Sequence, residues 1–374
     1  MEDDGSGHHR VPVYSTATEV VEKLKEKWSS VKKQPYPAMY SSVFGGIILD
    51  PTVMVIPIDD HMVHRGHGVF DTAMLLDGYL YELDVHLDRF LRSASKAKIT
   101  SPFPRETLRS ILIQMTAASK CKRGSIRYWL SAGPGNFLLS PADCPEAAFY
   151  AVVIDFDYSQ CKEGVQVITS TIPMKPPLFA TSKNVNYLPN VLSVMEAEEK
   201  GAFASIWVDD QGYIAEGPNV NVAFISKGKE LLLPPFDKIL SGCTVKRLVA
   251  LAPKLIEKGL LKAIRTAHMT IDQAKDSDEM MFVGSGLPVL PIVQWDDQLI
   301  GDGSNYSLVA DNTRFLVATL LCSYVFSCLC QEKFLCSYVF MFMSGKVGEA
   351  TLALSDLLWE DMIAGPLRIR VPYT

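Results

Sequence analysis

Residues 180–201 read ATSKNVNYLPNVLSVMEAEEKG. Lys183 follows an apolar run and precedes an expected helix, with Pro189 in its first turn and Gly201 at its end. A lysine at a helix entrance is either an ordinary surface side chain or an amine placed for covalent chemistry. Lys183 alone does not separate these alternatives, so the rest of the chain has to decide.

The composition is that of a large intracellular protein. The chain has 374 residues, 48% of them hydrophobic, which is enough for a sizeable core and suggests two domains. A net charge of -6, with no basic patch among aromatic residues, argues against a nucleic-acid partner. The eight cysteines contain no metal-type CxxC pair and favour a reduced protein over a disulfide framework.

The N-terminal part, residues 1–35, is expected to be an extension that carries an amphipathic helix over residues 15–28. Its acidic start, MEDDGSGHHRVPV, has neither the apolar segment of a signal peptide nor the Arg/Ser-rich character of a transit peptide. We therefore expect a cytosolic protein. A different start would leave a plastid or mitochondrial form open.

The patterns beyond the extension predict two α+β domains, a small one over residues 36–158 and a large one over residues 159–374. The first is expected to contain strands at 44–50, 52–58, 125–133 and 147–155. Its segment 78–86 is expected to begin as a strand and run into a helix at 87–99, and a second helix is expected at 106–119. The second is expected to contain a strand at 164–172, a hairpin at 204–226, a turn and helix at 241–259, a strand pair at 278–295 and a last helix at 353–362.

Residues 304–345 do not fit this plan. They contain the pentapeptide CSYVF twice, and their apolar character over 315–343 is interrupted by Glu332-Lys333, so a membrane span is the weaker interpretation. Deleting the segment would join a turn directly to the last helix. Our hypothesis is a retained in-frame intron, in which case the protein could be an inactive splice isoform.

Four features could carry chemistry: Lys183, the carboxylate of Glu216 in an apolar strand, the helix start at 241–244 and the glycine-rich HRGHGVFDT at 64–72. Each has a structural alternative, respectively a surface lysine, an exposed hairpin edge, a turn and a strand connection. Three histidines at spacing three also suggest a zinc site, but that geometry is demanding and we predict no metal. These histidines are His61, His64 and His67.

Two motifs together are more specific. Lys183-Asn-Val-Asn-Tyr187-Leu, followed by Ala215-Glu216-Gly217-x-x-x-Asn221, resembles the class IV aminotransferases, which are fold-type IV pyridoxal-phosphate enzymes. The resemblance covers 36–303 and 346–374 and is closest to plant branched-chain-aminotransferase-like and D-amino acid transaminase-like proteins.

This resemblance implies a homodimer of two-domain α+β subunits with pyridoxal 5'-phosphate in the interdomain cleft. It implies amino-group transfer from an amino acid to a 2-oxo acid, with neither a nucleic-acid nor a membrane partner. D-amino acid transaminase is our first expectation. Branched-chain L-amino acid aminotransferase and then aminodeoxychorismate lyase are the alternatives.

The resemblance also assigns roles to the catalytic centre. Lys183 would hold the cofactor covalently and later move a proton as general base and acid. Glu216 would pair with the pyridine nitrogen and keep the ring an electron sink. Tyr187 would hydrogen-bond the O3′ atom of the ring.

The remaining assigned residues would bind anions. Arg89 would bind the cofactor phosphate bidentately, and the backbone of Cys243 and Thr244 with Ser285 would complete the phosphate site. Arg127 would bind or orient the substrate carboxylate.

The chain departs from the family pattern at Pro218, where a small residue is usual, and at Ala223, where an aromatic residue is usual. The Arg and His set by which bacterial D-amino acid enzymes bind the substrate carboxylate is not recognisable. Substrate choice and stereochemistry are therefore not readable from the residues.

Overall fold

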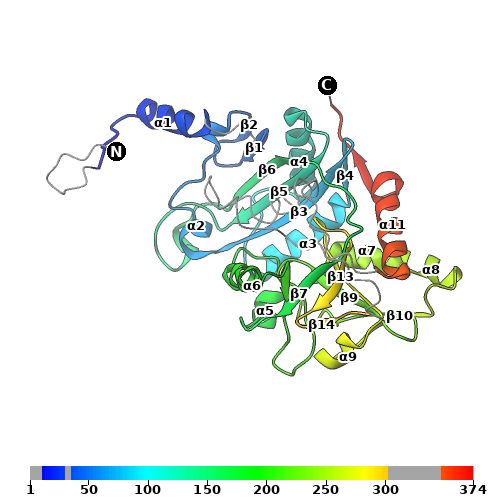
Figure 1. Ribbon diagram of the computed structural model, residues 1–374. Coiled ribbons are helices and arrows are strands. Elements are labelled where there is room, and N and C mark those ends of the chain that lie inside the picture. The colour runs from blue at the N-terminus through cyan, green and yellow to red at the C-terminus, as the bar shows by residue number, and fades with distance from the viewer. Residues whose placement is uncertain (1–10, 30–34, 302–346, 374) are drawn as a thin grey trace.

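A computed structural model describes residues 11–29, 35–301 and 347–373. These residues form two β-sheets with helices packed around and between them, which is the expected α+β architecture (Figure 1). Helix α1 (Ala17–Ser29) extends from the rest of the molecule at the N-terminal end. The amphipathic helix expected there is confirmed.

The first sheet is antiparallel throughout. Its strand order is β15 (Arg368–Arg370), β4 (Tyr79–Tyr81), β3 (Gly68–Leu76), β5 (Gly124–Ser131), β6 (Ala148–Asp155), β1 (Ala38–Ser41) and β2 (Gly46–Ile48). Helices α3 (Leu83–Lys96) and α4 (Arg105–Ser119) supply much of its core. Leu83, Leu87 and Phe90 recur at helical spacing on α3 and are fully buried, so the face that the sequence pattern marks is the face that packs.

The second sheet is mixed. Its order is β11 (Ala263–Thr266), β10 (Glu230–Leu233), β9 (Asn221–Ile225), β12 (Glu279–Val283), β13 (Leu290–Trp295), β7 (Val165–Thr169) and β8 (Ala204–Ile206), with β14 (Gln298–Leu299) beside β13. The helices of this half are α5 (Pro177–Ala180), α6 (Leu188–Glu199), α7 (Cys243–Leu251), α8 (Pro253–Glu257) and α9 (Ile271–Lys275). The expected lysine-segment helix and strand pair 278–295 are confirmed. The single helix expected at 241–259 is instead two helices, α7 and α8, which meet at Ala252.

Helix α11 (Glu349–Ala364) connects the two halves (Figure 1). It packs with α7 and α8 in a core that also takes Met74 and Leu76 from β3. Asp361 of α11 accepts hydrogen bonds from Tyr81 Oη and from the Arg247 guanidinium. The chain then returns through β15 to the first sheet, where it pairs with β4.

Two expected elements are wrong. Residues 52–58 form no strand: Asp50 caps the backbone N–H of Thr52 and starts a 3-10 turn at Pro51, and the apolar side chains that follow stay largely exposed. The hairpin 204–226 is wrong as a paired unit, because β8 pairs with β7 while β9 lies between β10 and β12. Only its middle turns back on itself, through the Val208–Ile214 bridge.

The sequence patterns also missed several elements. Helix α2 (His61–Arg65) and the nine-residue strand β3 occupy the glycine-rich stretch that was interpreted only as a turn. Strands β10, β11 and β15 were not expected either.

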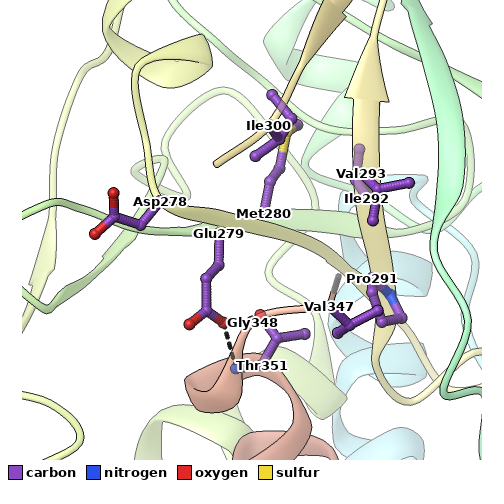
Figure 2. A pocket seen from close by; sticks show the side chains of 10 residues that line it. All are labelled: Asp278, Glu279, Met280, Pro291, Ile292, Val293, Ile300, Val347, Gly348 and Thr351. Atoms are coloured by element: carbon purple, nitrogen blue, oxygen red, sulfur yellow. Dashed lines mark hydrogen bonds between the residues drawn. The ribbon is translucent and has the colours of Figure 1, made fainter. Parts of the chain in front are cut away.

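The anomalous segment 304–345 lies outside the described residues. Its flanks do not: Ile300 and Val347 line the same small hollow, with a volume of about 10 Å³, between β12, β13 and the start of α11 (Figure 2). In this view Glu279 points at the N-terminus of α11 and accepts a hydrogen bond from the Thr351 backbone N–H at 2.6 Å. Among the described residues, no helix has both the length and the apolar character needed to cross a membrane.

Candidate functional site

The segment that carries Lys183 is held against strand β3. The backbone N–H of Phe70 donates to the Lys183 carbonyl at 2.9 Å, and the N–H of Val185 donates to the Gly68 carbonyl at 3.1 Å. The Lys183 N–H donates to Ser93 Oγ on α3 at 3.1 Å. The first two bonds fix the lysine backbone to the first sheet and the third fixes it to α3, although the strands on either side of the lysine, β7 and β8, belong to the second sheet.

The Lys183 side chain lies between two aromatic rings. Its Nζ is 3.2 Å from Tyr187 Oη and 4.6 Å from the centre of the Phe70 ring. Desolvation, followed by the positive charge of Arg89, lowers the pKa of Lys183 to about 8. A lysine of this kind is partly uncharged near neutral pH, and the uncharged amine is the nucleophile and base.

Glu216 is a buried carboxylate that faces the same region. It is 8% exposed, and its Oε2 accepts 3.3 Å hydrogen bonds from the Leu240 backbone N–H and from Asn221 Nδ2. Desolvation raises the pKa of Glu216 to about 8, against the opposing effects of the Leu240 N–H and of Lys175. A carboxyl group so placed is suited to a cationic or protonated partner that enters with a ligand.

A buried ionic cluster acts on the lysine through its charges. Arg89 donates to both carboxylate oxygens of Asp71, from Nε at 2.8 Å and from Nη2 at 2.7 Å, and His86 Nδ1 lies 2.8 Å from the same carboxylate. Burial opposes ionisation of Asp71, but Arg89 and His86 hold its pKa well below the usual range. The Nε/Nη2 edge of Arg89 is thus occupied by Asp71, so a phosphate would have to approach from the Nη1 side.

The N-terminus of α7 offers hydrogen-bond donors that could bind an anion. The helix begins after Gly242 with no side-chain cap on its first N–H groups. Thr244 Oγ1 and Ser285 Oγ lie 3.1 Å apart beside it. A Cβ on Gly242 would lie 2.1 Å from Asn221 Oδ1, so a larger residue would have to displace the Asn221 side chain from its hydrogen bond with the Leu240 carbonyl. Two hydroxyls and free backbone N–H groups form a donor set that fits a phosphate.

Arg127 lies on β5 of the first sheet, half-buried. Its Nε donates to Thr72 Oγ1 at 3.2 Å, and its guanidinium carbon is 5.8 Å from the centre of the Phe70 ring. Among the described residues no carboxylate pairs with it.

The structure brings the expected residues into one region. The charges of Arg89, Arg127 and Glu216 all act on the Lys183 amine. Cys243 lies in the same region. Burial alone would raise the pKa of its thiol, but the nearby positive charges of His86 and Arg89 outweigh this effect and lower the pKa.

Three residues of this region were not identified from the sequence: Asp71, His86 and Lys175. The stretch that carries Asp71 was noted as unusual, but its partner Arg89 lies on another element. Nothing in the pattern marked Lys175 as buried.

The three histidines make a contact but no metal site. His61 Nδ1 and His67 Nδ1 lie 3.1 Å apart, and the rings of His61 and His64 pack edge to face. No group of three or more ligating side chains suited to a metal ion occurs in the part of the chain that the structure describes.

Comparisons with known proteins agree with this geometry. The family model for amino-transferase class IV matches residues 68–295. The chain belongs to the class IV aminotransferases. This family is the one that the lysine and glutamate motifs predicted.

One relative extends the match over nearly the whole chain. It is 51% identical over 374 residues to the chloroplastic D-amino-acid transaminase of Arabidopsis thaliana, covering 99% of this chain and 88% of that relative. It is 26% identical over 264 residues to the D-alanine aminotransferase of Bacillus licheniformis, covering 70% of this chain and 90% of that one.

Solved structures support the fold. The T.th. branched-chain amino acid aminotransferase with pyridoxamine 5'-phosphate superposes with a TM-score of 0.74 at 19% identity, covering 91% of this chain and all of that one. The fold-type IV architecture of this aminotransferase chain is therefore confirmed.

Proposed function

We propose that this aminotransferase is a pyridoxal 5'-phosphate-dependent D-amino acid transaminase that moves an amino group from a D-amino acid to a 2-oxo acid. The observation that carries the proposal is a full-length match, at 51% identity, to a relative named for that activity. The lysine in an aromatic setting, the buried glutamate and the uncapped helix supply the groups that the reaction needs.

The cofactor would be held by residues from both halves of the chain. Thr244, Ser285 and the first N–H groups of α7 would bind its phosphate, with Arg89 approaching through Nη1. Glu216 would face the ring nitrogen, and Tyr187 the ring oxygen. Because Arg89 and Arg127 come from the small domain and the others from the large one, the cofactor would lie between 36–158 and 159–374.

Bound pyridoxal phosphate supplies an aldehyde that takes up the amino group and a ring that accepts electrons from the substrate Cα. Lys183 would supply the amine that holds the cofactor and then accepts and returns the Cα proton. With a pKa of about 8, roughly half of this amine is uncharged at pH 8, which suits an acid and base working near that pH. Arg127 would bind a substrate carboxylate.

A second candidate is branched-chain L-amino acid transfer. It is favoured by the fold-level match to a branched-chain amino acid aminotransferase. That match stands at 19% identity, well below the match to the D-amino-acid transaminase.

We further propose a homodimer. Large apolar side chains are exposed on neighbouring elements beside the lysine segment: Leu178, Phe179, Leu188, Val191, Leu192 and Met195. Such a group on α5 and α6 is suited to burial against a second copy of the chain. Sedimentation of the purified protein tests this.

A plastid form is supported by the chloroplastic relative, whereas the residues were interpreted as cytosolic. Localisation of a fluorescent fusion in leaf cells distinguishes the two compartments.

The activity test is a visible absorption spectrum of the purified protein given excess pyridoxal phosphate, followed by separate additions of D-alanine and L-valine. We expect a visible band that Lys183→Ala lacks and that D-alanine bleaches. Bleaching by L-valine alone would favour the branched-chain alternative. A folded protein with no band would refute the enzyme and favour an inactive isoform.

A further inference from the structure

Lys175 is a buried cation that none of the roles above uses. It is 8% exposed, and its Nζ lies 4.4 Å from the centre of the Tyr187 ring. Among the described residues, no hydrogen bond or salt bridge satisfies this ammonium group. Burying an ammonium group without a carboxylate partner is costly. Contact with one aromatic face compensates only part of that cost, so the group would be stabilised by a bound anion.

The chain around Lys175 is rigid. Pro173 precedes it by two residues, and Pro176 and Pro177 follow it directly, so its own backbone is restricted to extended conformations. Met174 packs against Trp207 and the residues around it, in a small core of its own.

The same segment is tied to Trp207, whose backbone is bonded to that of Glu216. Trp207 Nε1 donates to the Ile172 carbonyl at 2.9 Å, and the Trp207 backbone N–H donates to the Glu216 carbonyl at 2.9 Å. The backbone that carries Lys175 is therefore fixed beside the segment of Glu216, and the Lys175 ammonium contacts the Tyr187 ring from there.

The other anions of the site, present or proposed, do not pair with Lys175. Arg89 is neutralised by Asp71 within the ionic cluster. The proposed phosphate site lies at the N-terminus of α7. Lys175 lies instead on the Tyr187 side of Lys183, where its own pKa is lowered by burial and raised in part by Tyr187 and Glu216.

We propose that Lys175 is a substrate-binding residue whose ammonium group receives a carboxylate of the amino-acid or 2-oxo-acid substrate. The inference rests on the proposed transaminase function, because every substrate of that reaction carries a carboxylate. Lys175 would add a second cation beside Arg127 for carboxylate binding, which bacterial D-amino acid enzymes achieve with an Arg and His set that is not recognisable in this chain.

The test uses full-length protein loaded with pyridoxal phosphate and two probes that lack an amino group, propanoate and its uncharged analogue propanamide. Binding is measured by calorimetry for the wild type, Lys175→Gln, Lys175→Arg and the control Lys96→Gln. Lys96 is an exposed lysine whose Nζ donates to Thr181 Oγ1 at 3.0 Å, so the control removes a like charge near the same segment.

We expect Lys175→Gln to weaken propanoate binding about 10- to 100-fold, the usual effect of one charge-assisted hydrogen bond. Propanamide binding and the visible cofactor band should not change, and KM for D-alanine should rise more than kcat falls. Lys175→Arg should restore most of the propanoate affinity, and Lys96→Gln should match the wild type. If glutamine impairs folding, Lys175→Met repeats the test at similar side-chain length.

Unchanged propanoate binding in folded Lys175→Gln would overturn the inference. Loss of the cofactor band in that variant would overturn it too, since Lys175 would then hold the cofactor. If the wild type transfers no amino group, the proposed function is refuted. If Lys175→Gln still weakens propanoate binding in that case, the carboxylate site is supported.

Discussion

Replacing Glu216 with glutamine in the cofactor-free protein should make its stability less sensitive to alkaline pH. The carboxyl group is 8% exposed, and desolvation raises its pKa from an ordinary value of 4.5 to about 8. Glutamine has nearly the same shape and keeps the role of acceptor for the Leu240 N–H, but it has no proton to lose.

The size of the effect follows from proton linkage. The unfolded chain releases the Glu216 proton near pH 4.5, whereas the folded protein keeps it up to about pH 8. Between these values the folded state binds more protons, so its stability falls as pH rises. The full loss is about 5 kcal/mol, and about 3 kcal/mol of it falls between pH 6 and pH 9.

Thermal unfolding of the two proteins at pH 6 and pH 9 measures this difference. At about 2 °C per kcal/mol, the Tm of Glu216→Gln relative to the wild type should be about 6 °C higher at pH 9 than at pH 6. A relative Tm that is the same at both pH values would refute the buried, protonated Glu216 on which the argument depends.

Glu196 provides the matched control. Its carboxylate accepts hydrogen bonds from the Ser170 and Thr171 hydroxyls, which outweigh desolvation and lower its pKa to about 2. It is ionised throughout this pH range in both states. Glu196→Gln should therefore destabilise the protein by an amount that does not change between pH 6 and pH 9.

Three further changes test other parts of the structure. Thr244→Val removes a hydroxyl beside Ser285 and should weaken binding of pyridoxal phosphate about 10-fold, as read by equilibrium dialysis. Asp361→Asn breaks the ion pair with Arg247 and should cost about 2 kcal/mol of unfolding free energy in a urea titration, whereas unchanged stability would show that the pair is not needed. Replacing 302–346 by a four-residue Gly-Ser linker should leave Tm within about 2 °C, because both flanks of the segment line one hollow; a protein that no longer folds would contradict this.

Local patterns were sufficient for many of the elements. The apolar spacing of α3 and α4, the proline and glycine that bound α6, and the strand pair β12–β13 were all readable, because helix and hairpin signals depend on residues close together in the chain. The pattern failed at residues 52–58, where apolar, β-branched residues suggest a strand. Among the residues that the structure describes, no strand pairs with them.

The family and its chemistry were determined by the sequence itself. Lys183 and Glu216 stand in motifs whose residue types and order are unusual enough to identify class IV aminotransferases, and the family match agrees. Only the tertiary structure decided which charged groups lie near these residues and how each is paired. It shows that Asp71 pairs with Arg89 and that Lys175 is buried against the Tyr187 ring. Burial and ion pairing arise between elements that are far apart in the chain. The environment of a charged group, which sets its pKa and its chemical role, is therefore defined only when the sheets pack.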